Sequence, residues 1–510
     1  MPIKHALPVT RNADFAAWYQ AVITEADMAE ESGVRGCMVI RPWGYGIWER
    51  IQRLLDDRIK ATGHENCYFP VFIPLSYFEK EAEHVEGFAK EMAVVTHHRL
   101  ISDGKGGLVP DPSAKLEEPL VVRPTSEMVI GAAFARWIQS WRDLPVLINQ
   151  WANVVRWEMR TRMFLRTSEF LWQEGHTAHA SVAEAQEETR RMLEVYRSFS
   201  EDVVAMPVVA GEKPENERFP GAVETWSIEA MMQDGKALQA GTSHFLGANF
   251  ASAQNIRFQN AEGQFELANT TSWGMSTRMI GGLIMTHGDD DGLRVPPRLA
   301  PWQVVIVPML RDAPEDEAIV EYCRALRDEL GAQAAFGEPV RALLDLKPAK
   351  STAKRWGWVK KGAPVVIEVG GRDVAGGNLS VIRRDRLYRD DGKVDARIVT
   401  RDGFPKTVAD LLADIQSSLY AEARGRMDAN IRRDVTDMAA LEQAFAVEKP
   451  GWVEVQWSRP TGAALDAVVE RLKALKLTIR NTPIDAAPVD GRCLFTGEPA
   501  VERILVARAY

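Results

Sequence analysis

The 510-residue chain has only four cysteines, Cys37, Cys67, Cys323 and Cys493, and no two of them lie within 25 residues of each other. Zinc knuckles and small disulfide frameworks need closely spaced cysteines, so the sequence supports neither. We therefore expect four reduced thiols and no zinc.

Long hydrophobic runs are also missing. No stretch of 18 or more apolar residues occurs, so no transmembrane helix is predicted, and residues 1–8 lack the basic-then-apolar order of a signal peptide. Positive charge is not in excess: the formal net charge of −9 argues against non-specific coating of nucleic acid or membrane. A local basic face for RNA is still compatible with this charge. We expect a cytoplasmic protein with no membrane partner.

The length exceeds what one hydrophobic core supports, and the composition changes along the chain. A proline-rich linker at 296–301 separates the motif-rich residues 1–298 from a strand–helix–strand pattern in 299–405. Residues 406–510 combine a helical stretch with a small α/β tail. We predict an α/β multidomain fold with these three parts as domains.

Several local elements can be predicted from periodicity and capping. Apolar spacing predicts a helix over 47–61, and a short proline-bounded strand follows at 68–74. A second helix is expected over 126–142, with Thr125 as N-cap. Ser181 and Glu184 form a capping box that opens a third helix through about 204.

The most informative stretch is 150–176, which predicts a β-hairpin. Alternate residues of a strand share a face, so Arg156, Glu158 and Arg160 are expected to point the same way. Arg162 and Arg166 lie in the loop that follows. The return strand then places four more side chains on one face: Phe170, Trp172, Glu174 and His176. A half-exposed hairpin with surface ion pairs is the alternative interpretation.

Three further stretches favour a ligand site. Residues 123–127 (Arg-Pro-Thr-Ser-Glu) form a strand-to-helix turn, where backbone N–H groups suit an anion or polar ligand. Residues 239–244 (Gln-Ala-Gly-Thr-Ser-His) form a small polar turn. Arg278 opens an apolar helix, an arrangement that holds an arginine against the core while it points into a cleft.

These strings resemble a known enzyme family. Tyr68-Phe-Pro70, Arg156-x-Glu158 and Gly274-x-x-x-Arg278 are similar to the three signature motifs of class II aminoacyl-tRNA synthetases. The longer strings at 123–127, 164–176 and 241–244 resemble the prolyl-tRNA synthetases of the archaeal/eukaryotic-like type. The resemblance implies a class II antiparallel sheet with flanking helices, then an α/β anticodon-binding domain and a small α/β C-terminal domain.

The implied reaction is ATP-dependent activation of L-proline to prolyl-adenylate and transfer to tRNA(Pro). Carboxylate attack on the α-phosphorus needs positioning and charge stabilisation more than proton transfer, and a guanidinium suits phosphate. We expect Arg156 to hold the α-phosphate and the substrate carboxylate, and Arg278 to hold the far end of the triphosphate. By resemblance, Glu158 and Gln239 lie near Mg²⁺, and the ATP contacts are Glu158, Thr167, Gln239 and Thr242.

The resemblance also implies a proline pocket, in which an apolar slot holds the ring and acceptors hold the ammonium. Its predicted residues are Thr125, Glu127, Arg156, Trp172, Glu174, His176, Phe219 and His244. Ordinary packing is the alternative for Trp172 and Phe219. About 100 residues separate Glu174 from Arg278, which leaves no room for an editing insertion, so no alanine editing in cis is expected. Zinc-dependent threonyl- and seryl-type pockets are disfavoured because no cysteine lies between Cys67 and Cys323.

The tRNA side is predicted from basic residues interleaved with aromatics, which suit unstacked RNA bases. The candidate contacts are Arg160, Arg162, Lys354, Trp358 and Lys361. The alternative is a solvated basic face with packed tryptophans.

The sequence departs from the family where anticodon bases are expected to be read, at Gly357, Val359 and Val366, and only Cys493 remains of the usual C-terminal zinc ligands. These departures keep two alternatives open: a diverged paralogue with altered tRNA or acceptor choice, and a non-catalytic synthetase-like adaptor. A homodimer is implied through the segment that ends at Pro70.

Overall fold

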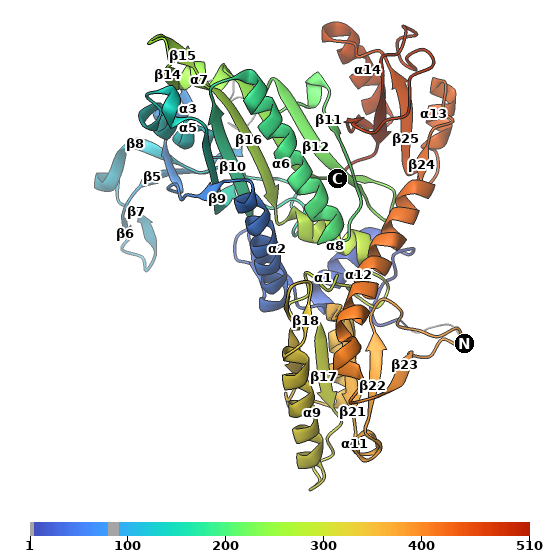
Figure 1. Cartoon of the computed structure of the whole chain (residues 1–510). Coiled ribbons are helices and arrows are strands. Elements are labelled where there is room, and N and C mark those ends of the chain that lie inside the picture. Colours follow the sequence, from blue (N-terminus) through green and yellow to red (C-terminus); the bar gives the residue numbers. More distant parts are fainter. Residues whose placement is uncertain (1–4, 80–90) are drawn as a thin grey trace.

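The computed structural model describes residues 5–79 and 91–510, which form three sheet-centred regions (Figure 1). The first region is built on an eight-stranded sheet of order β27-β11-β12-β13-β16-β10-β9-β3, antiparallel except for the β3–β9 pair. This confirms the predicted antiparallel sheet. Its strands are β3 (Glu65–Asn66), β9 (Val146–Val155), β10 (Glu169–His179), β11 (Val208–Glu212), β12 (Glu224–Met231), β13 (Ala237–Gly247), β16 (Asn269–Ser276) and β27 (Thr482–Pro483).

One face of the large sheet is covered by α6 (Val182–Asp202) (Figure 1). The predicted capping box is confirmed, with Ser181 and Glu184 each bonding the other's backbone N–H. Tyr196 and Phe199 of α6 are buried beneath the sheet, and Ser243 Oγ of β13 donates to Thr189 O of α6. The opposite face of the sheet is thereby left for other contacts.

Two more helices flank this region. α2 (Pro42–Ala61) confirms the helix predicted at 47–61 but begins at Pro42, because proline is favoured in the first helical turn. α8 (Arg278–His287) follows β16 directly and is buried over most of its length. Arg278 therefore stands at the start of a core helix, as predicted.

Some predicted elements are shorter than expected. The helix predicted over 126–142 is α5 (Glu127–Trp137), followed by a 3₁₀ turn, η3 (Trp141–Asp143). The strand predicted at 68–74 is only β4 (Phe72–Pro74), paired with β8 (Lys115–Val122), which also pairs with β5 (Val94–His97). β9 ends at Val155, so the prediction that Glu158 and Arg160 continue this strand is wrong: 156–168 is a loop.

The second region follows the linker and has a five-stranded sheet of order β20-β17-β21-β22-β23. Its first three members are parallel and joined by helices, as the strand–helix–strand pattern predicts. The elements are β17 (Val304–Pro308), α9 (Asp316–Gly331), β20 (Ala342–Leu344), α10 (Ser351–Lys361), β21 (Val365–Val369), α11 (Gly371–Gly376), β22 (Asn378–Arg383) and β23 (Ala396–Thr400).

The long helix α12 (Phe404–Ala429) runs from the second region to the third (Figure 1). The third region has a four-stranded sheet, β24-β25-β28-β26, over its own apolar core. Its elements are β24 (Ile431–Arg432), α13 (Met438–Ala444), β25 (Trp452–Trp457), α14 (Gly462–Ala474), β26 (Thr478–Ile479) and β28 (Glu502–Ala507).

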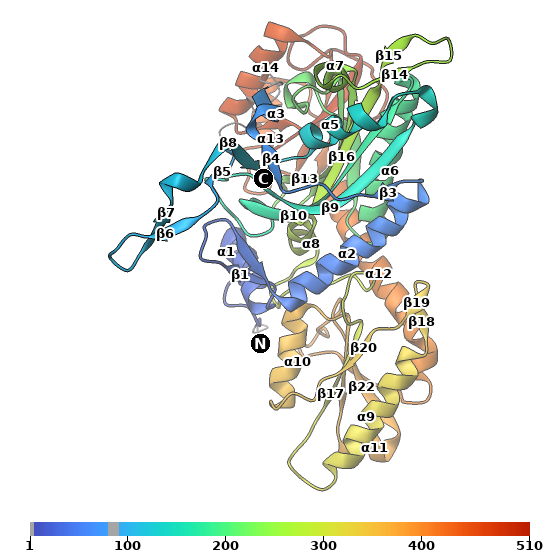
Figure 2. The same ribbon diagram turned by 90° about the vertical axis from the view of Figure 1, so that its left-hand side faces the viewer.

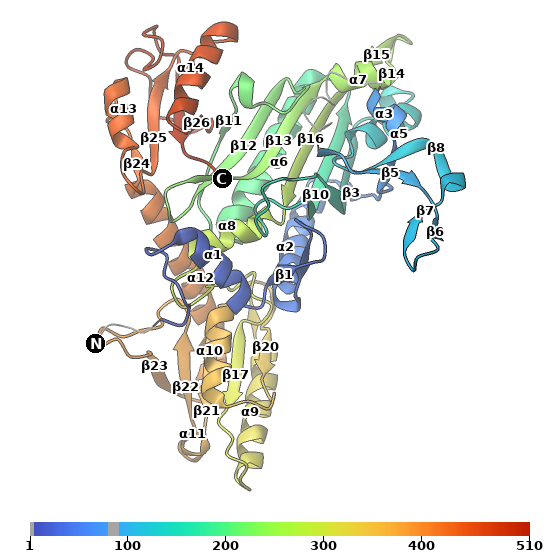
Figure 3. The ribbon, with the colours of Figure 1, turned by 180° about the vertical axis from the view of Figure 1, so that it is seen from behind.

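The end of the chain returns to the large sheet (Figure 3). Ala237 N donates to Arg508 O at 2.8 Å, and Tyr510 N donates to Ala237 O at 3.1 Å. The hairpin of β6 (Leu100–Ser102) and β7 (Leu108–Pro110) instead extends away from the body (Figure 2). Among the helices that the structure describes, none is long and apolar enough to cross a membrane.

Candidate active site

The open face of the large sheet carries rows of side chains from strands far apart in sequence. Glu174 of β10 pairs with Gly274 of β16, which pairs with Thr242 of β13. The next row begins at His176 and continues through Ser272 and His244 to Thr225 of β12. Residues directly opposite each other share a face of a sheet. The register therefore gathers the predicted strings onto one floor.

A cavity of about 260 Å³ lies on this floor. It brings together most of the predicted ligand residues: Thr125, Glu127, Arg156, Trp172, Glu174, His176, Phe219, Gln239, Thr242, His244 and Arg278.

Arg156 is fixed at the mouth of the hairpin loop. Its backbone N donates to Ser168 O at 2.8 Å, and its Nε donates to Pro124 O at 3.0 Å. The guanidinium carbon lies 5.4 Å from the centre of the Trp172 ring, within cation–π range. Burial lowers the pKa of Arg156, and the carboxylates of Glu127 and Glu174 oppose that shift. The side chain is thus a pre-positioned cation beside the cavity.

Glu174 and His176 form a buried polar pair. Glu174 Oε1 accepts from Gln150 Nε2 at 2.6 Å and from Ser126 Oγ, and His176 Nε2 lies 3.2 Å from Oε2. Burial disfavours both charged forms, but their mutual hydrogen bond and charges, with further hydrogen bonds from Ser126 and Gln150 to Glu174, outweigh it. The pKa of Glu174 is therefore lowered and that of His176 is raised. Ser126, not Thr125, is the N-cap residue of α5, and its hydroxyl serves Glu174 instead of the helix.

The cavity has an aromatic wall on the side of β13. The rings of Phe219 and His244 lie 4.9 Å apart and are tilted by 33°. Thr225 Oγ1 bonds His244 Nδ1 at 3.0 Å. Burial lowers the pKa of His244 to about 3, so its ring is neutral and behaves as part of the wall. Trp172 and Phe219 line the cavity, which favours the ligand interpretation over ordinary packing.

A second compartment of about 210 Å³ adjoins the first and shares Arg156 and Arg278 with it. Glu158 and Thr167 line this compartment. Arg278 Nε donates to Leu165 O at 3.0 Å, which fixes the guanidinium against the loop. Burial, together with the charges of Arg166 and Arg156, lowers the pKa of Arg278 to about 10. Three arginines line this compartment, Arg156, Arg166 and Arg278, and such a group of cations suits a polyanion.

The predicted Mg²⁺ ligands lie in different compartments. Gln239 lines the first compartment and Glu158 the second, so the structure does not bring them into one cavity. Across residues 5–79 and 91–510 no group of three or more His, Cys, Asp or Glu side chains could hold a metal. Mg²⁺ in nucleotide sites is typically bound by one or two protein groups plus phosphates, so the residues present fit a cation that arrives with ATP.

The predicted tRNA contacts are not brought together. Arg160 is exposed in the 156–168 loop, and the Arg162 guanidinium lies 5.9 Å from the Tyr510 ring. Lys361 lies in the second region and pairs with Asp27 at 3.2 Å.

Two of these residues are interior. Lys354 Nζ donates to Asp345 O at 2.9 Å, and Trp358 Nε1 donates to Asp345 Oδ2 at 2.8 Å. The Trp358 ring meets Trp43 edge-on at 5.7 Å. These buried contacts contradict the prediction that Lys354 and Trp358 bind RNA and favour the alternative of packed tryptophans. Val359 and Val366 are each 1% exposed, so both departures from the family pattern are core positions.

Sequence reasoning missed several cavity residues. Thr225, Ser272 and Ser276 all line the first compartment. Ser272 and Ser276 were detectable in principle, because they alternate with Gly274 along a strand that leads into Arg278. Thr225 carries no motif; only the β12–β13 register places it beside His244.

Comparison with known proteins agrees with this geometry. Residues 112–287 match the family described as tRNA synthetase class II core domain (G, H, P, S and T), and residues 303–406 match the family described as anticodon binding domain. A proline–tRNA ligase from Sphingomonas elodea is 78% identical over 510 residues, covering 100% of both chains. One from Sphingopyxis alaskensis is 72% identical, covering 100% of this chain and 96% of its own. One from Bdellovibrio bacteriovorus is 53% identical, covering 99% of both.

Proposed function

The chain belongs to the prolyl-tRNA synthetases, a family of class II aminoacyl-tRNA synthetases, and on that basis we propose how its cleft residues divide the work. The enzyme activates L-proline with ATP and transfers it to tRNA(Pro). The observation that carries this function is the full-length identity to proline–tRNA ligases. The comparisons give no support to a diverged paralogue or a non-catalytic adaptor.

Arg156 is assigned to the reacting centre. Its guanidinium lines both compartments, so it can hold the α-phosphate and the proline carboxylate at once. The carboxylate oxygen attacks the α-phosphorus while pyrophosphate leaves, and a fixed cation there stabilises charge that spreads over the phosphoryl oxygens. Its fixation by Pro124 O and Ser168 O means that little reorganisation is needed during reaction.

The part of the first compartment toward His244 is assigned to proline. Phe219 and Trp172 offer the apolar slot for the ring, and Thr125 and Glu127 offer acceptors for the ammonium. Glu174 and His176 support this floor from below through their mutual bond, and His244 braces Phe219. A missing methylene in such a slot changes binding by only roughly 1–3 kcal/mol, so alanine is excluded weakly.

The second compartment and the Gln239–Thr242 part of the first are assigned to ATP. Arg278 holds the far end of the triphosphate, with Glu158, Thr167, Gln239 and Thr242 as further contacts. Because they line adjoining compartments, Glu158 and Gln239 would each offer a separate ligand to Mg²⁺ that arrives with ATP, and the ion would neutralise phosphate charge when bound. This chain's own part is to orient the triphosphate between Arg156 and Arg278.

The three regions are assigned as a catalytic domain (1–298), an anticodon-binding domain (299–405) and a helical connection with the C-terminal domain (406–510). The matched ranges 112–287 and 303–406 support this division. Arg160, Arg162 and Lys361 remain proposed tRNA contacts. We also assign the enzyme to the cytoplasm.

A homodimer is proposed through the segment that ends at Pro70. Two large apolar side chains beside the end of this segment are exposed, Tyr68 at 72% and Phe72 at 48%. Light scattering at micromolar concentration is expected to give twice the 56.9 kDa chain mass.

Proline-dependent ATP–pyrophosphate exchange tests the assigned activity. We expect exchange with proline, weaker exchange with alanine and none with threonine. Absence of proline-dependent exchange would overturn the function. Charging of tRNA(Pro) transcripts with altered anticodon bases then measures whether recognition survives with Gly357, Val359 and Val366 in place.

A further inference from the structure

Glu229 is an unexpected charge on the ligand face of the large sheet. It is fully buried on β12, directly opposite Gln239 of β13. The neighbouring pairs on the same two strands are Ser227 with Thr242 and Thr225 with His244. Glu229 therefore lies on the same face of β12 as Thr225 and Ser227. This face forms the floor of the cleft, although Glu229 does not line the cavity itself. No motif in the sequence marks it.

Two buried cations hold the Glu229 carboxylate. Lys213 Nζ lies 2.9 Å from Oε1, and Arg480 contacts Oε2 through Nη2 at 2.9 Å and Nε at 3.1 Å. Ser227 Oγ also donates to Oε1 at 3.0 Å. Burial alone would raise the pKa of Glu229, but the two cations lower it, so the group is an anion. With all three groups ionised, Lys213, Glu229 and Arg480 have a formal net charge of +1; burial lowers the pKa of Lys213, and the Glu229 charge opposes that shift.

Arg480 comes from the C-terminal region and is held rigidly. Its backbone N donates to Leu505 O at 2.7 Å, and its Nη1 donates to Thr478 Oγ1 at 2.8 Å. The next residues, β27, pair with β11 and extend the catalytic sheet. A side chain at Gly211 would come within 2.3 Å of Thr482 O, so the close approach of the two strands requires glycine there.

This cluster lies within electrostatic reach of the nucleotide compartment. Both ions affect the pKa of Arg278: Glu229 raises it, and Arg480 lowers it. Burial and the charges of Arg166 and Arg156 have larger effects on the same pKa. Buried ion clusters are poor contributors to stability, because desolvation offsets the attraction between the charges. The cluster of Lys213, Glu229 and Arg480 lies opposite Gln239, which we assign to ATP, and this position indicates a role in the reaction.

We propose that Arg480 and Lys213 are positioning residues for adenylate formation: they hold Glu229 against Gln239, so that the C-terminal region completes the ATP-binding face of the catalytic sheet. The proposal rests on the assignment of Gln239 to ATP. It concerns ATP and not proline, because the cluster adjoins the Gln239 end of the β12–β13 pair and the proline wall lies at the His244 end.

The test is ATP–pyrophosphate exchange with the full-length chain, with KM measured separately for ATP and proline. For Arg480→Met we expect a rise in KM for ATP of roughly 10–100-fold, the range seen when residues supporting a ligand shell are lost, with KM for proline unchanged. Arg480→Lys is expected to recover part of the loss, because it restores the charge. The matched control is Arg459→Met, which removes another contact between the same regions, Arg459 Nη2 to Glu212 Oε2 at 2.7 Å. It should leave both KM values near wild type.

Equal effects of Arg480→Met and Arg459→Met, or equal rises in both KM values, would overturn the proposal, because a merely structural contact predicts either result. If Arg480→Met is recovered only unfolded, Arg480→Lys and Glu229→Gln decide the question by the same comparison. Gln239→Ala separates the assignment of Gln239 to ATP from the role of the cluster. If this variant leaves KM for ATP unchanged, the assignment of Gln239 is refuted. A rise with Gln239→Ala but none with Arg480→Met refutes only the role of the cluster.

Discussion

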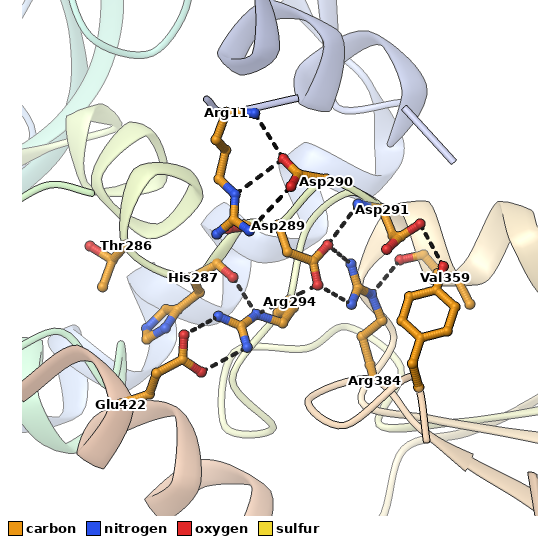
Figure 4. Close-up of polar contacts among 12 residues, drawn as sticks. Arg11, Thr286, His287, Asp289, Asp290, Asp291, Arg294, Val359, Arg384 and Glu422 are labelled. Atoms are coloured by element: carbon orange, nitrogen blue, oxygen red, sulfur yellow. Dashed lines mark hydrogen bonds and ion pairs between the residues drawn. The ribbon is translucent and has the colours of Figure 1, made fainter. Parts of the chain in front are cut away.

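Arg384 of the anticodon-binding region donates two hydrogen bonds to the Asp289 carboxylate, Nη1 to Oδ2 at 2.7 Å and Nη2 to Oδ1 at 2.5 Å (Figure 4). Asp289 lies two residues beyond α8, and Arg278 begins that helix. The helix that begins at Arg278, which we assign to the triphosphate, is therefore tied at its other end to the region expected to meet the anticodon. Arg294, which lies just before the linker, likewise binds Glu422 of α12 through two nitrogens, at 2.7 and 2.8 Å.

Arg384→Met is predicted to destabilise the enzyme. Burial raises the pKa of Asp289, but Arg384 outweighs it and lowers that pKa, so the variant leaves a largely buried anion without its main partner. We expect a loss of roughly 2–4 kcal/mol in the free energy of unfolding, measured with urea. Arg424→Met, which removes the exposed Arg424–Asp428 pair, is the control and should cost about 0.5 kcal/mol or less. Similar losses in both variants would show that Asp289 finds other partners.

The protein is predicted to lose stability as the pH is lowered, because His287 is buried in its neutral form. Burial, then the charges of Arg294 and Arg426, lower its pKa to about 3, whereas the unfolded chain has an ordinary value of about 6.5. Between these values the unfolded state binds the extra proton. The stabilisation is therefore full above about pH 6.5 and declines as pH falls, by about 2 kcal/mol at pH 5. His287→Gln should lose less stability than wild type between pH 7 and pH 5; parallel curves would contradict the shift.

Arg156→Ala is predicted to abolish adenylate formation while leaving the fold intact. A transition-state charge contact is typically worth on the order of 10²–10³ in rate, and Arg156 is assigned to two substrates at once. Proline-dependent exchange should fall by at least this factor, with little change in circular dichroism. Exchange near the wild-type rate would show that the α-phosphate assignment is wrong.

Phe219→Ala is predicted to act on proline alone. The ring packs on His244 at 4.9 Å and faces the first compartment, so truncation opens the apolar slot. KM for proline should rise by roughly 10- to 100-fold, with KM for ATP unchanged. Phe265→Ala, at a ring that is 65% exposed, is the control. A matching rise in KM for ATP would show instead that the wall has collapsed.

Alanine mischarging is predicted to accumulate. With no editing insertion expected, discrimination depends on the slot, and one pocket typically separates such amino acids by roughly 10–200-fold. The ester of pre-formed Ala-tRNA(Pro) incubated with the enzyme should hydrolyse only at the uncatalysed rate. Enzyme-dependent hydrolysis would reveal an editing activity.

The sequence by itself determined the chemistry and most of the parts of the site. Arg156, Glu174, His244 and Arg278 could be proposed as site residues because they lie in local strings that resemble the motifs of the family. Helix α6 was predictable because its capping box and apolar period are local properties.

Only the tertiary structure decided which basic and aromatic residues are interior, and which distant segments meet. Trp358 stands among lysines in the sequence, yet Asp345 and Trp43 bury it. Arg480 meets Glu229 across 251 positions of the chain. Burial and long-range pairing depend on how three sheets pack together, and no local pattern records that packing. The physical reason is that periodicity marks which face of an element is apolar but not what will cover it.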